Sequence, residues 1–218
     1  MKKILYMAVS VAVGSSALGL SARENPFLKP YQTQYEIAPY SEIMIEDFIP
    51  AIKVGVAEQD ANILKIVSNP EPADFNNTIL ALEDSSPILE RVASVYYHYD
   101  GALSTPEFAA LAEEAIPLLN DASNRVNLNP DLFARIKEAY DNRDALGMTP
   151  VQKRVTEKYY REFAERGAAL PADKKAELSR INNELSKLFI QYNKNLLAAT
   201  NDFYIHVGAD AVSGLPES

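Results

Sequence analysis

The sequence predicts an all-α fold, a chain of several helices with one short β-strand close to its C-terminal end. Three observations support this prediction. Residues that cap helix N-termini recur along the chain, and several of them are followed directly by proline. Apolar residues recur every three or four positions, as they do on one face of a helix. The long stretch 172–207 contains neither glycine nor proline, so nothing in it interrupts a helix.

Residues 23–40 form a proline-rich lead-in before the first expected helix. Pro26, Pro30 and Pro39 each lack a backbone donor and disfavour helix at the residue before them. We therefore expect this segment to be extended.

From residue 41 to residue 200 the pattern is helical, and we interpret this stretch as one helical lobe. Pro50 and Pro87 are expected to break or kink the first two helices. Loops are expected at 69–72 and 166–171, which are rich in proline or glycine. The expected helices span 42–68, 76–102, 105–126, 130–143, 150–167 and 172–200.

Several helix starts can be assigned from their capping residues. Thr149 can accept from the backbone N–H of Gln152, the Gln152 side chain can reach back, and Pro150 occupies a position that needs no donor. Other starts of the cap-then-proline kind are Asn129-Pro130 and Thr105-Pro106, and a weaker one without proline is Asn77-Thr78.

The apolar residues agree with these helices. One apolar stripe is predicted to run down the last long helix and to be buried, so that an aspartate at Leu185 would destabilise the fold strongly. A shorter stripe is formed by Val151, Val155, Tyr159 and Phe163. The long stripe, called the α-stripe below, consists of Leu178, Ile181, Leu185, Leu188, Tyr192, Leu196 and Ala199.

Residues 201–218 follow the last expected helix. Phe203, Ile205 and Val207 alternate with Tyr204 and His206, which predicts one short strand at 201–207. The segment that begins at Leu215 resembles the start of a further helix.

Residues 1–22 have the three-part layout of a secretory signal peptide. A basic start at Lys2 and Lys3 precedes an apolar run at 4–13, and Leu20-Ser21-Ala22 is a suitable cleavage site. The alternative is a membrane anchor, but the run is shorter than the ~20 apolar residues that span a bilayer. We expect an exported, periplasmic protein that has no membrane contact after cleavage.

Composition excludes several classes of function. Without cysteine, the chain cannot form a disulfide framework, a zinc-thiolate site or a thiol nucleophile. Its formal net charge is −9, and no cluster of lysine and arginine interrupts the acidic balance, so nucleic acid is not an expected partner.

The search for catalytic motifs assigns no catalytic, cofactor-binding or metal-binding residue. The two histidines, His98 and His206, are not part of an HExxH motif. The patterns of serine hydrolases, phosphate-binding loops and dinucleotide-binding turns are also missing from the sequence.

His98 lies between tyrosines, in a cluster that could line a peptide channel. The simpler interpretation is that Tyr96 and Tyr99 share one helix face and pack, while His98 points elsewhere. His206 is interpreted as an outward partner of Tyr204. Neighbouring carboxylates are interpreted as solvated surface rather than as acid–base pairs, and they occur at Glu46-Asp47, Glu83-Asp84 and Glu113-Glu114.

An ordered set of short motifs resembles a known family. The first is Asn25-Pro26-Phe27-Leu28, followed by the segments 46–51, 55–59, 69–78 and 81–83, then 128–136, 159–163, 181–185 and 195–201. Their order and spacing resemble the N-terminal part of bacterial peptidyl-dipeptidases, which are zinc metallopeptidases of the thimet oligopeptidase and oligopeptidase A type. The resemblance covers about residues 25 to 218.

The resemblance implies a mostly helical, two-lobed protein with a deep channel, in which these helices form part of the wall and admit short peptides. It implies a zinc site in a later, catalytic lobe, with no ligand in this chain, so the 218 residues alone are expected to be inactive. Two alternatives remain open, an oligopeptidase A-like endopeptidase and a free-standing helical binding module.

Overall fold

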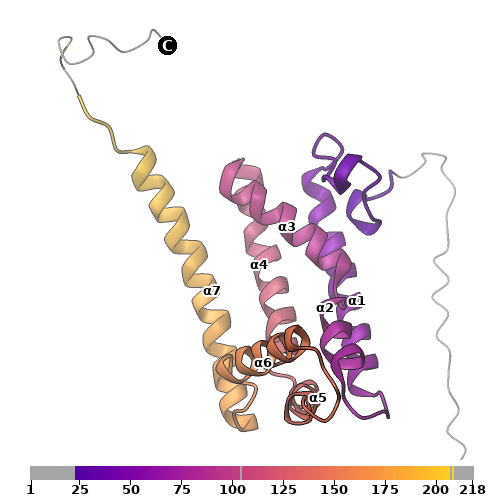
Figure 1. Cartoon of the computed structure of the whole chain (residues 1–218). Helices are drawn as coiled ribbons and strands as arrows, with labels where there is room; N and C mark the ends of the chain where they lie inside the picture. The colour runs from indigo at the N-terminus through magenta and orange to yellow at the C-terminus, as the bar shows by residue number, and fades with distance from the viewer. Residues whose placement is uncertain (1–22, 104, 207, 209–218) are drawn as a thin grey trace, which may run out of the picture.

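The computed structural model describes residues 23–103, 105–206 and 208, and all regular structure in them is helical (Figure 1). The predicted all-α class is therefore confirmed. Two single turns, Pro26–Leu28 and Gln34–Glu36, lie in the lead-in. The longer elements are α1 Ile45–Val67, η3 Phe75–Leu80, α2 Ala81–Glu83, α3 Pro87–Ala102, α4 Pro106–Asn127, α5 Pro130–Asp141, α6 Pro150–Glu165 and α7 Ala172–Asn201.

Most predicted helix starts are confirmed in detail. Thr149 and Gln152 form the reciprocal capping box. The Gln152 backbone N–H donates to the Thr149 hydroxyl at 3.2 Å, and the Thr149 backbone N–H donates to the Gln152 side chain at 2.9 Å. Asn129 accepts from two backbone N–H groups at 3.0 Å, and Thr105 caps α4. The start assigned at Asn77-Thr78 is wrong, because Asp74 is the cap and Asn77 is its partner three residues later.

The two prolines behave differently. Pro87 is the first residue of α3, so the predicted break is confirmed there. Pro50 lies inside α1, which continues through it to Val67. Pro50 does not break α1, because its neighbours Phe48, Ala51 and Ile52 are fully buried, and their packing holds the helix together across the one missing donor.

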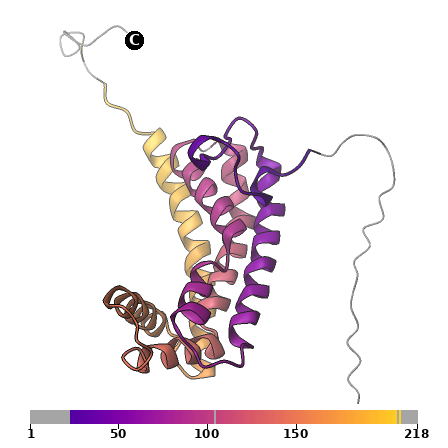
Figure 2. The same ribbon diagram turned by 45° about the vertical axis from the view of Figure 1, so that its right-hand side comes forward.

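The core consists of two large clusters and a small one, formed by Ala73, Ala139 and Met148. Figure 2 shows the bundle from a second side. In the first, aromatic rings from the lead-in, α1, α3 and α4 meet, and Phe48 lies 5.3 Å from Phe108 between ring centroids. In the second, α1, η3 and α2 pack on α5 and α6. Its buried residues are Ile63, Ile66, Ile79, Leu82, Leu132, Ile136, Phe163 and Ala168.

The predicted strand at 201–207 is wrong. Helix α7 continues to Asn201, and residues 203–206 form neither helix nor strand, while residue 207 lies outside the described part of the chain. Phe203, Tyr204 and Ile205 are all exposed. Alternation of apolar residues cannot make a strand unless a second strand satisfies its backbone groups, and the described residues contain none.

The predicted burial of the α-stripe is also wrong. No residue of α7 is buried, and Leu185 is 57% exposed. In Figure 1, α7 lies at the edge of the bundle and contacts it through α4. A charge at Leu185 is therefore not expected to unfold this chain.

The predicted signal peptide, residues 1–22, lies outside the described residues. Within the part that is described, no helix combines the length and the apolar character needed to cross a membrane.

Candidate functional site

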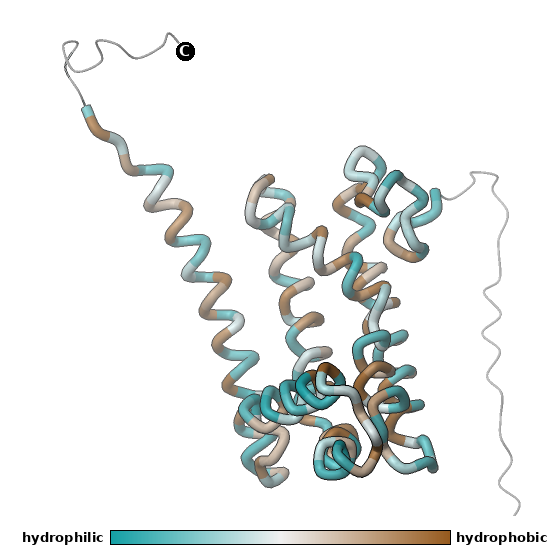
Figure 3. Tube along the Cα trace, in the orientation of Figure 1, coloured by the Kyte–Doolittle hydropathy of each residue, from teal (hydrophilic) through white to brown (hydrophobic). Residues whose placement is uncertain are grey.

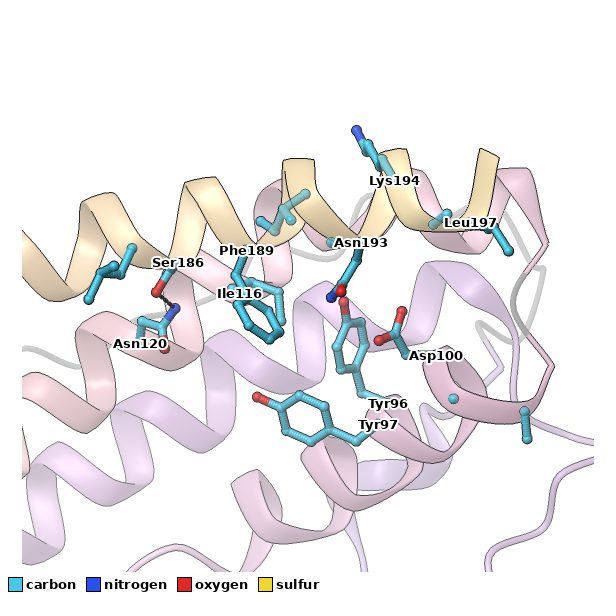
Figure 4. Close-up of a pocket in the computed structure, with 16 residues that line it drawn as sticks. Tyr96, Tyr97, Asp100, Ile116, Asn120, Ser186, Phe189, Asn193, Lys194 and Leu197 are labelled. Atoms are coloured by element: carbon cyan, nitrogen blue, oxygen red, sulfur yellow. Dashed lines mark hydrogen bonds between the residues drawn. The ribbon is translucent and has the colours of Figure 1, made fainter. Parts of the chain in front are cut away.

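An apolar groove with a volume of about 870 Å³ lies between α3, α4 and α7 (Figure 4). Helix α3 contributes Tyr96, Tyr97 and Asp100, and the side chains of α7 form the opposite wall. This volume falls within the range of small-ligand and peptide sites. Apolar residues from α4 and α7 that line it include Ile116, Leu185, Phe189, Ile190 and Leu197.

Tyr96 is the most constrained polar residue of the groove. Its side chain is fully buried against Phe48 and Phe108, and its hydroxyl has no hydrogen-bond partner. Figure 4 shows this hydroxyl pointing towards α7, in the direction of Asn193. Burial, and then the nearby charge of Asp100, raise the pKa of Tyr96 well above its usual range, so the phenol stays neutral.

Three other polar residues of the groove, Lys194, Ser186 and Asn120, are already engaged. Lys194 pairs with Glu113 of α4 at 2.6 Å, and this contact lowers the pKa of Glu113. The Ser186 hydroxyl donates to the Asn182 carbonyl at 2.8 Å and accepts from Asn120 at 2.6 Å, the contact drawn in Figure 4. Ser186 is therefore held as a structural residue and is not paired with a base.

The interpretation of the histidines is confirmed. Tyr96 and Tyr99 pack with Phe48, while His98 is exposed and its ring lies 5.6 Å from that of Tyr40. His206 is exposed and contacts Tyr204, with ring centroids 5.0 Å apart, although no strand holds them.

These histidines do not fit a catalytic zinc ion. Such an ion takes about three protein ligands and one open position. Nowhere among residues 23–103, 105–206 and 208 do three histidine, cysteine, aspartate or glutamate side chains gather closely enough to hold a metal. No catalytic step can be derived through a metal at these residues.

The carboxylate pairs are surface groups with one exception. Glu83 and Asp84 are exposed, and Glu114 pairs with Lys53 at 2.8 Å. For Asp47 the interpretation is wrong, because its side chain is buried at the start of α1. It accepts from Arg23 at 2.6 Å and from the backbone N–H of Met44 at 2.8 Å, so it joins the lead-in to the bundle.

The sequence did not predict the groove because its walls lie on three helices, and the apolar pattern of a single helix does not show how the three pack together. For the cluster around Tyr96, packing is the simpler interpretation beside a channel lining, and Asn193 has no motif around it. A usable signal was the repeated amide and hydroxyl side chains on one side of α7, at Asn182, Asn183 and Ser186. The resulting arrangement can bind apolar side chains, and it brings together no nucleophile and base.

No family model matches the chain. Individual relatives match clearly. The chain is 36% identical to the dipeptidyl carboxypeptidase of Escherichia coli over 175 residues, which are 80% of this chain and 26% of that protein. It is 34% identical to the dipeptidyl carboxypeptidase of Salmonella typhimurium over 81% of this chain and 26% of the relative.

Oligopeptidase A of Escherichia coli is a more distant relative. The identity is 28% over 195 residues, or 89% of this chain and 28% of that protein. The chain thus spans about a quarter of the length of the curated relatives it matches. The resemblance inferred from the ordered motifs is confirmed, and the chain belongs to the family of the dipeptidyl carboxypeptidases and oligopeptidases A.

Proposed function

We propose that the chain is the N-terminal, substrate-channel lobe of a zinc peptidyl-dipeptidase that removes C-terminal dipeptides from short peptides. The observation that carries the proposal is the 36% identity with the dipeptidyl carboxypeptidase of Escherichia coli, spread over 80% of this chain. Such identity along the whole bundle supports a shared fold and a shared place in a longer protein.

In this proposal the chain positions the substrate, and the catalytic lobe supplies the chemistry. Zinc would polarise the scissile carbonyl and its bound water in that second lobe. The rigid helices described here would exclude folded proteins and align a peptide, which makes the reaction effectively unimolecular. Two clusters of the core, one rich in aromatic rings and one mainly aliphatic, provide the rigidity that this role requires.

An oligopeptidase A-like endopeptidase is the second candidate. It is favoured by the match to oligopeptidase A of Escherichia coli, which extends over 89% of this chain, although the identity falls to 28%. The products separate the two candidates, because an endopeptidase cuts inside a peptide and a peptidyl-dipeptidase releases only dipeptides from its C-terminus.

A chimera tests the proposed function. The matched segment of the Escherichia coli dipeptidyl carboxypeptidase is replaced by the corresponding segment of this chain, and dipeptide release from a short peptide with a blocked N-terminus is measured. We expect a folded, zinc-dependent enzyme. The Escherichia coli enzyme with the segment deleted is the control and is expected to be inactive.

A folded chimera without peptidase activity would contradict the proposal. The reading frame of the gene beyond codon 218 gives a second, independent answer. A frame that continues to an HExxH motif supports the peptidase lobe, and a stop codon there supports the free-standing binding module.

We also propose export to the periplasm, with cleavage after Ala22. It is supported by the contacts of Arg23, the residue that follows the predicted cleavage site. Its guanidinium donates to the Glu42 carbonyl at 2.7 Å and to the buried Asp47. N-terminal sequencing of periplasmic material is expected to give Arg23 as the first residue, and material that still begins with Met1 would contradict export.

A further inference from the structure

Helix α7 presents its apolar residues to solvent. Leu185, Leu188, Phe189, Tyr192 and Leu196 are each between 51% and 65% exposed, and Figure 3 shows hydrophobic positions along the whole helix. Single exposed apolar residues are common, but a continuous row of them marks an interaction surface. The row spans several turns, so it is longer than a small ligand needs.

The hydrogen bonds that attach α7 to α4 are made by polar side chains. Asn120 donates to Ser186 at 2.6 Å, and Asn182 donates to Asn124 at 2.9 Å. Asn183 donates to Asp121 at 3.0 Å. In an isolated globular fold the apolar face of a surface helix normally turns towards the core. Here the polar contacts orient α7 so that the α-stripe remains available to something else.

The groove continues this surface inwards. Leu185, Phe189 and Leu197 belong to its wall, and the buried Tyr96 hydroxyl at its base has no partner. The surface therefore suits an occupant that is mainly apolar.

We infer that the α-stripe and the groove form the docking surface for the part of the peptidase that this chain does not span. This inference rests on the proposed function. The occupant follows from two facts: the relatives are matched over only 26–28% of their length, and the exposed row has the extent of an interface between helices. A helical, apolar face of the remaining part covers α7.

The test compares one substitution in two contexts. Leu188→Glu places a charge on the exposed stripe, outside the groove. In the full chain alone we expect an unchanged melting temperature, because Leu188 is already in contact with water. In the chimera with the Escherichia coli enzyme we expect the melting temperature to fall by roughly 5 °C or more, because the charge is buried at the interface.

Val151→Glu is the matched control. Val151 is 73% exposed on α6 and does not line the groove, so this change is expected to be neutral in both proteins.

Three outcomes would overturn the inference. The first is an active chimera in which Leu188→Glu is as neutral as Val151→Glu, which refutes the docking surface and leaves the proposed function intact. The second is a dimer of the isolated chain, seen by light scattering and dissociated by Leu188→Glu, which assigns the surface to a second copy. The third is a chimera that does not fold although its parent does, which contradicts the proposed function as well.

Discussion

Arg135 shows how a single charged side chain can hold a loop in place. It is buried on α5, where its guanidinium donates to the carbonyls of Asn69 and Glu71 at 2.9 and 3.1 Å and to the Asn77 side chain at 3.0 Å. Asn69 and Glu71 belong to the connection between α1 and η3, and Asn77 lies in η3. Its charge-assisted hydrogen bonds therefore fix the path of the chain between the two parts of the second cluster.

We predict that Arg135→Met lowers the free energy of unfolding by about 3 kcal/mol, because three part-buried hydrogen bonds from a charged group are lost. Urea denaturation followed by circular dichroism measures this loss. Arg180→Met is the control, since Arg180 is exposed and pairs only with Glu184 on the same helix. Equal effects of the two substitutions would contradict the structural role of Arg135.

The tyrosines of α3 predict a pH dependence. Burial, and then Asp100, raise the pKa of both Tyr96 and Tyr97 in the folded chain, whereas in the unfolded chain both phenols titrate near pH 10. Above that pH the unfolded state has lost protons that the folded state keeps. The stability that these groups confer is thus complete below pH 10 and is lost as the pH rises.

We therefore expect the urea midpoint to fall between pH 9 and about pH 11, and to fall less in Tyr96→Phe. Tyrosinate absorbance, recorded on the same samples, reports which phenols ionise before unfolding. An identical fall in the parent and in Tyr96→Phe would show that the Tyr96 phenol does not contribute.

At the scale of the helices, the positions of helix starts could be predicted from the sequence, and the packing between helices could not. The starts of α4, α5 and α6 could be predicted because a cap and a proline act within one turn of chain. The exposure of α7 could not be predicted. The α-stripe shows that one face of the helix is apolar, but it does not show which part of the protein packs against that face. The groove depends on the same packing, so it was equally hidden in the sequence.

Helices α1 and α3 approach most closely at Gly55. A Cβ atom on Gly55 would lie 2.7 Å from the backbone nitrogen of Leu89, so the two helices would have to separate. We predict that Gly55→Ala destabilises the chain by about 1–3 kcal/mol, since overpacking against backbone cannot be relieved by a rotamer change.

Gly101→Ala near the end of α3 is the matched control. Nothing lies within 4 Å of its added Cβ, and alanine favours helix, so a gain of up to about 1 kcal/mol is expected. Thermal melts of both variants measure the difference. A Gly55→Ala chain as stable as Gly101→Ala would place α1 and α3 further apart than described.

At the scale of the whole molecule, a well-packed bundle is joined to a helix that leaves its apolar face open. The two large core clusters hold α1 to α6 together, while α7 is attached through amides, a serine and the Lys194–Glu113 pair. This asymmetry agrees with a chain that spans about a quarter of its relatives. It also agrees with a division of roles in which this chain positions the substrate and the proposed second lobe carries out the chemistry.

That division of roles is tested most directly by the isolated chain itself. The purified protein is incubated with zinc and a short peptide with a blocked N-terminus, beside the dipeptidyl carboxypeptidase of Escherichia coli. We predict no release of dipeptide by the chain and no tight zinc binding. Among the described residues, neither histidine lies in a group of three side chains that could hold a metal ion. Zinc-dependent dipeptide release by the chain alone, abolished by His98→Ala or His206→Ala, would contradict the assignment of the chemistry to another lobe.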